Sequence, residues 1–374
     1  MPDQLTEEQS ELASFVRTLL GQRSDSAANR AAMASEPGYD RDLWRVLCEE
    51  IGAASLAIPE EFGGSGFSVF ETHLVLEELG AALTPSPYLG SVAIAAQAVL
   101  LAGDEDAAAR LLPGIADGSR IATLAWADAA GRWAPDRVSV RASAGSAGEG
   151  TWRLDGDSIL ALDGMAADTI VAIALTPDGP RLFEVVDADA VERIFTPALD
   201  PALRFATLRF SATPARPIGG ADPEVLDRVR DAALIAISAV QVGVAGRALR
   251  NTIDYSTQRV QFGRKIGSFQ ALKHRMADMH VQVETARTVS RAAAALAADG
   301  ASDLVEPAAL AKAWCSDAVE HVAAETIQLH GGIAITWEHD AHLIFKRAHA
   351  TSQLLGTAAE QRTRIATQIG LVEV

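Results

Sequence analysis

Cysteine, basic residues and long apolar runs are all scarce in this sequence of 374 residues. Its two cysteines, Cys48 and Cys315, lie far apart, each inside a helical pattern. Disulfides persist in oxidising compartments, whereas thiols stay reduced in the cytoplasm. We therefore interpret both cysteines as buried, unreactive thiols and predict a cytoplasmic protein.

Positive charge is outweighed by negative charge. The chain has 32 Lys and Arg against 49 Asp and Glu, a formal net charge of −17, and a pI near 4.9. This balance argues against nucleic acid and anionic membranes as main partners. It does not exclude a phosphate-bearing ligand, because local Arg groups and helix N-termini can bind one.

No apolar run long enough to span a bilayer is evident in the sequence. The most apolar stretch, Val92 to Leu101, is shorter than the roughly 20 residues that a transmembrane helix needs. The acidic N-terminus has neither the basic n-region nor the apolar h-region of a signal peptide, so we expect no signal peptide and no membrane insertion. The length and the hydrophobic fraction of 49% suit two or three sub-domains that share a core.

Helical spacing dominates the first third of the chain. The sequence Thr6-Glu-Glu-Gln9 is a capping-box pattern, and apolar residues at helical spacing follow it. The small, polar stretch 24–30 is predicted to be a loop. A second helix is predicted to start in Leu43–Cys48, and another is predicted from about Ser68 to Leu83. Residues 1–120 are therefore predicted to form an N-terminal α-helical domain.

The helical period fades in the middle of the chain. Between residues 121 and 220, turn formers separate short β-type runs, which are Val138–Ala142, Thr151–Leu154, Thr169–Leu175 and Thr207–Phe210. We predict a small antiparallel β domain over residues 121–220.

Helical spacing returns in the last third. Long, Ala-rich amphipathic runs cover Asp227–Thr257, Gln270–Ala298 and Pro307–Leu329, and each is long enough for a helical bundle. Residues 221–374 are therefore predicted to form a C-terminal helical domain. The order of helices, strands and helices predicts an α+β fold.

The stretch from Arg259 to Gln270 separates two of these helices. One interpretation is a helix C-terminus, with cationic side chains at the negative end of the dipole and Gly263 as the turn. The other is a site for a phosphate and a ring. In that interpretation Arg259 offers a forked donor to a pyrophosphate, and Phe262 and Phe269 offer flat faces. The residues alone leave both interpretations open.

Two further stretches also allow both a structural interpretation and a ligand-binding interpretation. Gln328-Leu-His-Gly-Gly332 is either a Gly-rich helix end or a bare backbone that a cofactor approaches closely, with Gln328 as an amide donor. Thr357-Ala-Ala-Glu360 is a capping box, which predicts a new helix at Thr357. The free N–H groups at that helix start can meet a phosphate or a ribose.

Taken together, these stretches resemble the acyl-CoA dehydrogenase family, and the resemblance covers nearly the whole chain. Each motif is weak alone, but all of them occur in order over an α–β–α pattern. They are Ile58-Pro-Glu-Glu-Phe-Gly-Gly-Ser-Gly66, Gln261-Phe-Gly-Arg-Lys-Ile-Gly-Ser-Phe-Gln270, Ala277-Asp-Met279, Gln328-Leu-His-Gly-Gly332 and Gly356-Thr357.

The resemblance implies a helical N-terminal domain, a β domain and a C-terminal four-helix bundle. It also implies an acyl-CoA substrate and FAD lying across a subunit interface, with an electron acceptor such as an electron-transfer flavoprotein. The side chains implied to hold the FAD of one site are Arg259, Phe262, Phe269 and Gln270. Those implied to reach the FAD of a neighbouring subunit are Gln328, Gly331 and Gly332.

The catalytic base of that family is missing at both of its usual positions. The family's reaction removes a proton alpha to a thioester, which needs a carboxylate with a raised pKa. The resemblance places this carboxylate just before Gly356, where the residue is Leu355, or early in the first bundle helix, at Ala233. We interpret Asp227 and Asp231 as solvated or N-terminal helix charges, and Asp231 stays an alternative base.

The β domain also departs from the family pattern. The family's Thr-Glu-Pro…Gly-Ser-Asp loop is replaced by Trp126-Ala-Asp-Ala-Ala-Gly-Arg132, and its aromatic-Ile-Thr-Asn strand by Leu160-Ala-Leu-Asp163. A hydroxyl donor to the flavin thereby becomes Leu162. This combination resembles the non-catalytic subunits of heteromeric acyl-CoA dehydrogenases of actinobacterial steroid side-chain degradation.

Histidines are concentrated toward the C-terminus, and Glu338-His339-Asp-Ala-His342 contains residue types that bind metals. The family places a surface turn and a helix start there, so we expect no metal. His330 lies beside the glycine pair, and it is either a contact of FAD or a structural histidine.

Our main hypothesis is a flavoprotein subunit of a heterotetrameric acyl-CoA dehydrogenase, with a homologous catalytic subunit that supplies the base. One alternative is a self-sufficient homotetramer that uses another base, such as Asp231. The other alternative is a scaffold subunit that binds no FAD.

Overall fold

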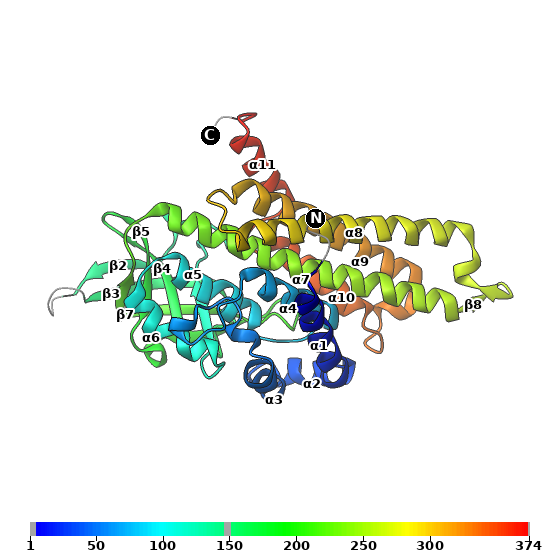
Figure 1. Cartoon of the computed structure of the whole chain (residues 1–374), viewed down its shortest axis with the longest axis horizontal. Helices are drawn as coiled ribbons and strands as arrows, with labels where there is room; N and C mark the ends of the chain where they lie inside the picture. The colour runs from blue at the N-terminus through cyan, green and yellow to red at the C-terminus, as the bar shows by residue number, and fades with distance from the viewer. Residues whose placement is uncertain (1–4, 146–150, 373–374) are drawn as a thin grey trace. The chain divides into compact units, whose positions relative to one another are not determined.

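The computed structural model describes residues 5–145 and 151–372. Its contacts divide the chain into two compact units. Unit 1 comprises Met1–Ala31, His73–Thr84 and Leu234–Val374, and unit 2 comprises Ala32–Thr72 and Pro85–Ala233. Helices, then strands, then helices follow one another along the chain (Figure 1), which confirms the predicted fold class. The division into three domains at residues 120 and 220 stays a prediction.

The first helix begins as the sequence predicts. In front of α1 (Glu7–Arg23), the backbone N–H of Gln9 donates to the Thr6 hydroxyl, and the Gln9 side chain accepts from the Thr6 N–H. The predicted loop over residues 24–30 is wrong, because α2 (Ser26–Ala34) begins there. Asp25 caps this helix by accepting a hydrogen bond of 2.8 Å from the Ala28 N–H, and the small residues of the stretch suit a helix interior.

The other helices before the sheet are mostly short. The predicted second helix is α3 (Arg41–Arg45), which continues as the π-helix η1 (Val46–Glu50), and the predicted helix over 68–83 is α4 (Val69–Ala82). The remaining ones are η2 (Ala53–Ser55), η3 (Glu60–Phe62), the π-helix η4 (Leu89–Ala96), α5 (Gln97–Leu101) and α6 (Glu105–Ala116).

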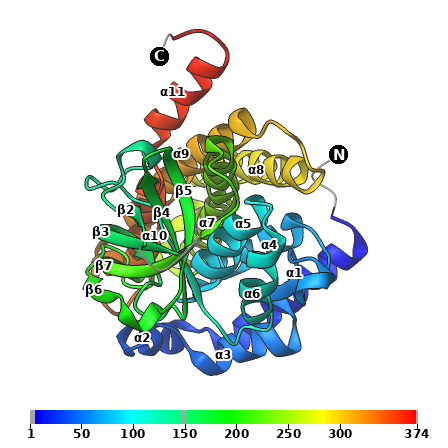
Figure 2. The ribbon, with the colours of Figure 1, turned by 90° about the vertical axis from the view of Figure 1, so that its left-hand side faces the viewer.

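Seven strands form the sheet of unit 2 (Figure 2). They are β1 (Ala122–Ala125), β2 (Arg141–Ala144), β3 (Trp152–Leu162), β4 (Thr169–Thr176), β5 (Gly179–Val185), β6 (Glu192–Thr196) and β7 (Phe205–Ile218), with the 3-10 helices η5 (Pro135–Arg137) and η6 (Ala188–Ala190) between them. The pairings β2–β3, β3–β7, β7–β5, β5–β4 and β4–β2 close a ring, which leaves these strands without a long free edge.

The sheet is mixed rather than purely antiparallel. β4 runs parallel to β1 and to β2, while the other pairs are antiparallel. The predicted antiparallel domain was therefore wrong in these two pairs. The β3–β4 connection brings β4 back beside β1 and β2 in their own direction, and such non-local pairing leaves no local sequence signal.

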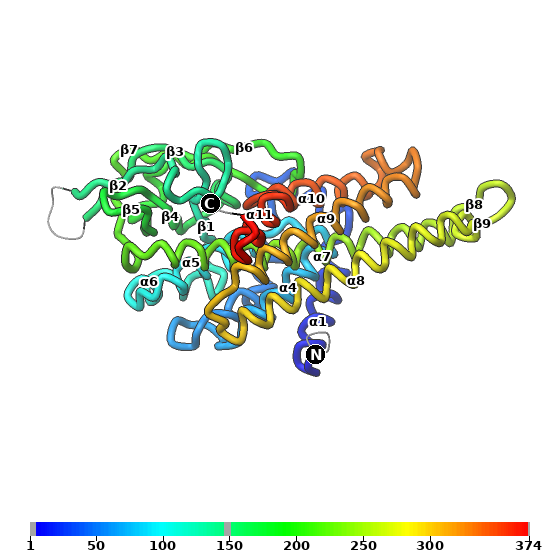
Figure 3. Tube along the Cα trace, turned by 90° about the horizontal axis from the view of Figure 1, so that it is seen from above, coloured from blue at the N-terminus to red at the C-terminus, as the bar shows by residue number. Residues whose placement is uncertain are grey.

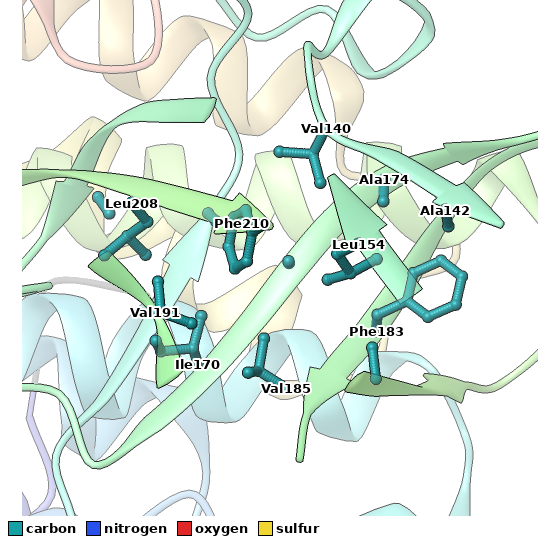
Figure 4. Close-up of a cluster of buried hydrophobic side chains, with 14 of the residues drawn as sticks. Val140, Ala142, Leu154, Ile170, Ala174, Phe183, Val185, Val191, Leu208 and Phe210 are labelled. Atoms are coloured by element: carbon teal, nitrogen blue, oxygen red, sulfur yellow. The ribbon is translucent and has the colours of Figure 1, made fainter. Parts of the chain in front are cut away.

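Alternate side chains of the paired strands fill the centre of unit 2. Leu154, Ile170, Phe183, Leu208 and Phe210 belong to one cluster of buried apolar side chains (Figure 4). Trp152 packs against this cluster, with its ring 5.5 Å from that of Phe183. Burying such side chains supplies the main free energy that holds the ring of strands closed.

Long helices make up most of unit 1. The antiparallel pair α7 (Pro223–Gln258) and α8 (Gln270–Ala298) is joined by a hairpin of β8 (Val260–Gln261) and β9 (Arg264–Lys265) and by η7 (Ile266–Ser268) (Figure 3). α9 (Val305–His330), η8 (Gly331–Ile335), α10 (Ala341–Gln353) and α11 (Ala358–Gln368) follow. α8, α10 and α11 all contact α9, so α9 is the central helix of this group.

Within residues 5–145 and 151–372, one helix, α7, is long and apolar enough to cross a membrane by length and composition. In its most apolar window of 18 residues, 89% of the residues are buried inside the molecule. A core helix passes the same test, so this composition matches the buried position of α7.

Candidate functional site

The β8–β9 hairpin presents an aromatic pair and two guanidinium groups at one end of unit 1. Phe262 has a φ of 53° and is 92% exposed. Its ring meets the edge of the Phe269 ring at 6.2 Å, and the Arg264 guanidinium lies 3.9 Å over the Phe269 ring. The backbone of Arg259 ties the hairpin base together, because its carbonyl accepts from the Ile266 N–H at 2.9 Å.

The end of α9 lies beside the end of α7. The His330 ring stacks on the Tyr255 ring at 4.5 Å, and its Nδ1 donates to the Thr326 carbonyl at 2.7 Å. Burial lowers the pKa of His330. His330 therefore has a structural role, whether or not it also meets a cofactor.

The glycine pair after His330 leaves room for a ligand. Gly331 has a φ of 68°, and no atom lies within 4 Å of a Cβ built at Gly331 or Gly332. Gln328 is exposed one turn earlier. We call the region of Arg259, Phe262, Phe269 and Gln270 together with Gln328, Gly331 and Gly332 the hairpin end of unit 1.

Thr357 lies elsewhere in unit 1. It caps α11, where its hydroxyl accepts from the Glu360 N–H at 3.2 Å and the Glu360 carboxylate accepts from the Thr357 N–H at 2.7 Å, so the predicted capping box is confirmed. The residue before it, Gly356, contacts Lys312. Lys312 and Gln328 are 16 positions apart on α9, or about 24 Å along the helix axis. Thr357 is therefore not part of the hairpin end within one chain.

Leu355 lies in the turn between α10 and α11, which we call the α10–α11 turn, residues 353–357. The Leu355 side chain is buried and its φ is 58°, a left-handed conformation that is costly for a residue with a Cβ atom. The Gln361 side chain donates to the Leu355 carbonyl at 3.2 Å. An apolar side chain thus occupies the first position predicted to lack a base.

The second such position, Ala233, is buried in α7. Two residues earlier, Asp231 is only 2% exposed, and its carboxylate lies 3.8 Å from the Arg230 guanidinium. The interpretation of Asp231 as a solvated charge was wrong, because its side chain is buried. Asp227, by contrast, is exposed and pairs with Arg230 at 2.6 Å.

In each of the two divergent segments of the β domain, polar groups form hydrogen bonds with other residues of unit 2. Asp128 accepts hydrogen bonds of 2.8 Å from the backbone N–H groups of Ala130 and Arg132. Burial opposes the charge of Asp128, but these hydrogen bonds and the Arg132 guanidinium together outweigh burial and lower the pKa of Asp128. At the other segment, Leu162 is buried, and its carbonyl accepts from the Thr123 hydroxyl at 2.7 Å. Neither segment offers a side-chain hydroxyl.

Lys312 was missed by the sequence interpretation. It lies in the middle of α9 with a relative exposure of 0%. Its amine donates to the carbonyls of Ser352 and Gly356 at 2.8 and 3.1 Å and contacts the Ser316 hydroxyl at 3.0 Å. A lone lysine in an Ala-rich helix normally indicates a solvated position, so no local signal distinguished it.

The cysteines and the C-terminal histidines are the other groups that the sequence pointed to. Cys48 and Cys315 are buried free thiols, as predicted, and burial raises the pKa of each to about 12. In the part of the chain that the structure describes, no group of three or more His, Cys, Asp or Glu is placed to hold a metal. The helix start predicted near His339 is found, with α10 beginning at Ala341.

The geometry and the sequence comparisons define the class of protein together. Residues 6–119 match the family model described as acyl-CoA dehydrogenase, N-terminal domain, and residues 232–370 match the one described as acyl-CoA dehydrogenase, C-terminal domain. The chain belongs to the acyl-CoA dehydrogenase family.

Individual relatives cover almost the whole chain. Acyl-CoA dehydrogenase IpdE2 of Mycobacterium tuberculosis is 41% identical over 97% of this chain and 98% of its own length. The solved ChsE4–ChsE5 complex from Mycobacterium tuberculosis contains a chain with a TM-score of 0.90 and 30% identity, covering 99% of both chains. A variant of the Tcur3481–Tcur3483 steroid ACAD has a TM-score of 0.87 and 32% identity, covering 98% of both chains.

Membership of this family implies FAD as the cofactor. The groups at the hairpin end fit such a molecule, since it carries a pyrophosphate, riboses and flat rings. Guanidinium groups suit the pyrophosphate, the exposed ring of Phe262 suits a flat ring, and the open space at Gly331 and Gly332 permits close approach to the backbone.

Proposed function

We propose that this chain is a base-lacking subunit of a heteromeric, FAD-dependent acyl-CoA dehydrogenase. The reaction introduces a double bond between the alpha and beta carbons of an acyl-CoA thioester. Bound FAD supplies the hydride acceptor for the beta carbon, while a carboxylate takes the alpha proton. In this proposal the carboxylate comes from a homologous catalytic subunit.

The observation that carries the proposal is the buried, apolar side chain of Leu355 in the α10–α11 turn. Leu355 fills the position that the family resemblance assigns to a base, and Ala233 fills the other. Neither side chain can accept a proton. The loss of a hydroxyl at Leu162 adds a third change, on the side of the site that faces the reacting carbons in the family.

The relatives support a heteromer and a steroid-derived acyl group. Two similar solved structures are described as a ChsE4–ChsE5 complex and as a Tcur3481–Tcur3483 steroid ACAD, so each names two chains. We extend this arrangement to the present chain and propose a steroid side chain as the acyl group. An electron-transfer flavoprotein is the proposed electron acceptor.

We further propose the FAD contacts. At the hairpin end, Arg259, Phe262, Phe269 and Gln270 bind FAD. Gln328, Gly331 and Gly332 reach the FAD of a neighbouring subunit, and the N-terminus of α11 at Thr357 meets a phosphate or ribose. The distance between Thr357 and the hairpin end supports contributions to different cofactors in an assembled oligomer.

The test compares the purified chain alone with the same chain co-purified with a homologous acyl-CoA dehydrogenase that carries the base. Turnover of acyl-CoA esters with an artificial electron acceptor is measured for each. We expect the lone chain to be about 10²–10⁴-fold slower than the pair, the usual contribution of a general base. Equal turnover by the lone chain would overturn the proposal.

One observation favours a second candidate, a self-sufficient homomeric acyl-CoA dehydrogenase. Asp231 is a buried carboxylate two positions from Ala233, near the place where the family keeps a base. Asp231→Asn in the assembled enzyme distinguishes the two, with the exposed Asp227→Asn on the same helix as a matched control. Loss of activity in the first variant alone would favour the homomer.

A scaffold subunit without FAD is tested by the visible absorbance of the assembled protein. A flavin band with more than one FAD per catalytic subunit would indicate that this chain contributes to a flavin site of its own.

A further inference from the structure

Lys312 has an environment that is unusual for a lysine. The side chain has no exposure, although lysine is among the residues least often buried. All three hydrogen-bond partners of its amine are neutral groups: the Ser352 carbonyl, the Gly356 carbonyl and the Ser316 hydroxyl. Burying an amine costs free energy unless it forms hydrogen bonds. These three contacts therefore offset the cost of burying the Lys312 amine.

The two carbonyls lie on opposite sides of Leu355. Ser352 belongs to the last turn of α10, where helix carbonyls lack a partner from their own helix. Gly356 directly precedes the Thr357 cap of α11. The amine of α9 therefore joins the end of α10 to the start of α11 across the α10–α11 turn.

The conformation of the turn requires such support. Leu355 and Gly356 have φ values of 58° and 107°. A left-handed conformation at a residue like leucine costs about 1–2 kcal/mol and persists when the surroundings impose it. Gln361, itself buried, donates to the Leu355 carbonyl, and Lys312 donates to the next carbonyl.

The same contacts suit both protonation states of the amine. An ammonium group donates three hydrogen bonds, whereas a neutral amine donates two and accepts one. Ser316 can donate to the neutral amine while its oxygen accepts from the Gln241 side chain at 3.0 Å. Burial lowers the pKa of Lys312 to about 7, against the opposing effects of Cys315, Glu320 and Glu360.

We propose that Lys312 is a positioning residue that fixes the α10–α11 turn, and with it the placement of Leu355 and the first turn of α11. The inference rests on the proposed function in one step only, that this turn borders the acyl-CoA site. Lys312 does not touch the reacting atoms. It sets the shape of the wall that Leu355 forms there, and hence the affinity for the acyl chain.

The first experiment measures hydrogen–deuterium exchange of the assembled protein carrying Lys312→Met, a substitution that keeps the length of the side chain and removes the donors. We expect peptides covering the α10–α11 turn to exchange about tenfold faster, while peptides from α8 keep their rates. Lys273→Met, on the exposed surface of α8, is the matched control. An unchanged turn, or acceleration spread evenly over unit 1, would refute the proposal.

The wild-type protein provides a second arm if Lys312→Met does not fold. A turn held by Lys312 is expected to exchange at least about tenfold more slowly than the exposed connection between α8 and α9, residues 299–304. Equal exchange rates in the two connections would contradict a positioning role.

The kinetic arm separates this inference from the proposed function. In the active pair of subunits, Lys312→Met is expected to raise the KM for acyl-CoA by about tenfold with kcat nearly unchanged, because it weakens binding without altering the base. A fall in kcat alone would contradict the role proposed for Lys312. If the wild-type pair shows no turnover at all, the proposed function fails, while the exchange result still decides whether Lys312 positions the turn.

Discussion

His73 is a buried histidine whose neighbours keep it neutral. Its Nε2 lies 3.1 Å from the Ser290 hydroxyl, which in turn lies 2.6 Å from the Ser238 hydroxyl. Burial lowers the pKa of His73 from 6.5 to about 4; Glu77 opposes this shift, and Arg291 adds to it. The charge state of one side chain is thereby coupled to the packing of three helices of unit 1.

This coupling predicts a loss of stability in mild acid. Between pH 6.5 and about 4 the unfolded chain binds the His73 proton and the folded chain does not, so the free energy of unfolding falls as the pH drops. The slope from this residue is up to about 1.4 kcal/mol per pH unit. Urea denaturation at several pH values should show a shallower decline for His73→Gln and an unchanged one for His280→Gln, at an exposed site. Identical pH profiles for wild type and His73→Gln would contradict this account.

Asp231 and Lys312 show that the identity of a residue does not reveal whether its side chain is buried. Both are charged residues in helical patterns, and both turn out to be buried. The side of a helix that is covered depends on which other elements pack against it, and that depends on residues far along the chain. The reverse holds for Leu355, whose lack of an acid group is visible in the sequence itself.

At the scale of elements, two helices of unit 1 cross at a pair of glycines. A Cβ built at Gly243 of α7 would lie 2.0 Å from the Glu77 carbonyl oxygen of α4, and one at Gly80 of α4 would lie 2.4 Å from the Val240 carbonyl oxygen of α7. Only residues without a Cβ permit the two backbones to approach this closely.

Gly243→Ala is therefore expected to destabilise the protein, despite the higher helix propensity of alanine. The methyl group forces α4 and α7 apart, at a cost of about 1–3 kcal/mol or more in the free energy of unfolding. Gly246→Ala on the same helix is the control, because its Cβ would meet only the flexible ends of Arg250 and Arg287, at 3.3 Å. If chemical denaturation gives Gly243→Ala a higher free energy of unfolding than Gly246→Ala, α4 and α7 can move apart at little cost.

Element prediction succeeded where the signal was local. The residues of α8 follow one uninterrupted helical pattern, and the predicted range Gln270–Ala298 agrees with the observed helix. The capping boxes at Thr6 and Thr357 were equally local. Strands β5 and β6 were not predicted, since their short sequences acquire a strand conformation mainly by pairing, β5 with β4 and β7 and β6 with β7.

At the scale of the whole molecule, exposed aromatic surface at the hairpin end is the feature that a cofactor and a second subunit would cover. Phe262 is almost fully exposed in the single chain, which is an unfavourable state for a large apolar side chain in water. Covering its ring by a cofactor or a partner would remove this cost.

Phe262→Ser is accordingly expected to weaken FAD retention by about tenfold, the equivalent of about 1.4 kcal/mol of stacking, with little effect on the stability of the single chain. The ratio of flavin to protein absorbance after gel filtration measures the retention. Phe15→Ser, which removes another exposed ring, on α1, should leave it unchanged. Full flavin occupancy in the Phe262 variant would remove this ring from the proposed site.

The sequence by itself determined the long helices α7, α8 and α9, the caps at Thr6 and Thr357, the family motifs and the absence of an acid at Leu355 and Ala233. Each of these features depends on residues that are close together in the sequence. The tertiary structure decided the closure of the strand ring, the parallel pairing of β4, the burial of Asp231 and the hydrogen bonds that hold the Lys312 amine. These features arise between segments far apart in the chain. Their free energy comes from burial and pairing that form only when those segments meet.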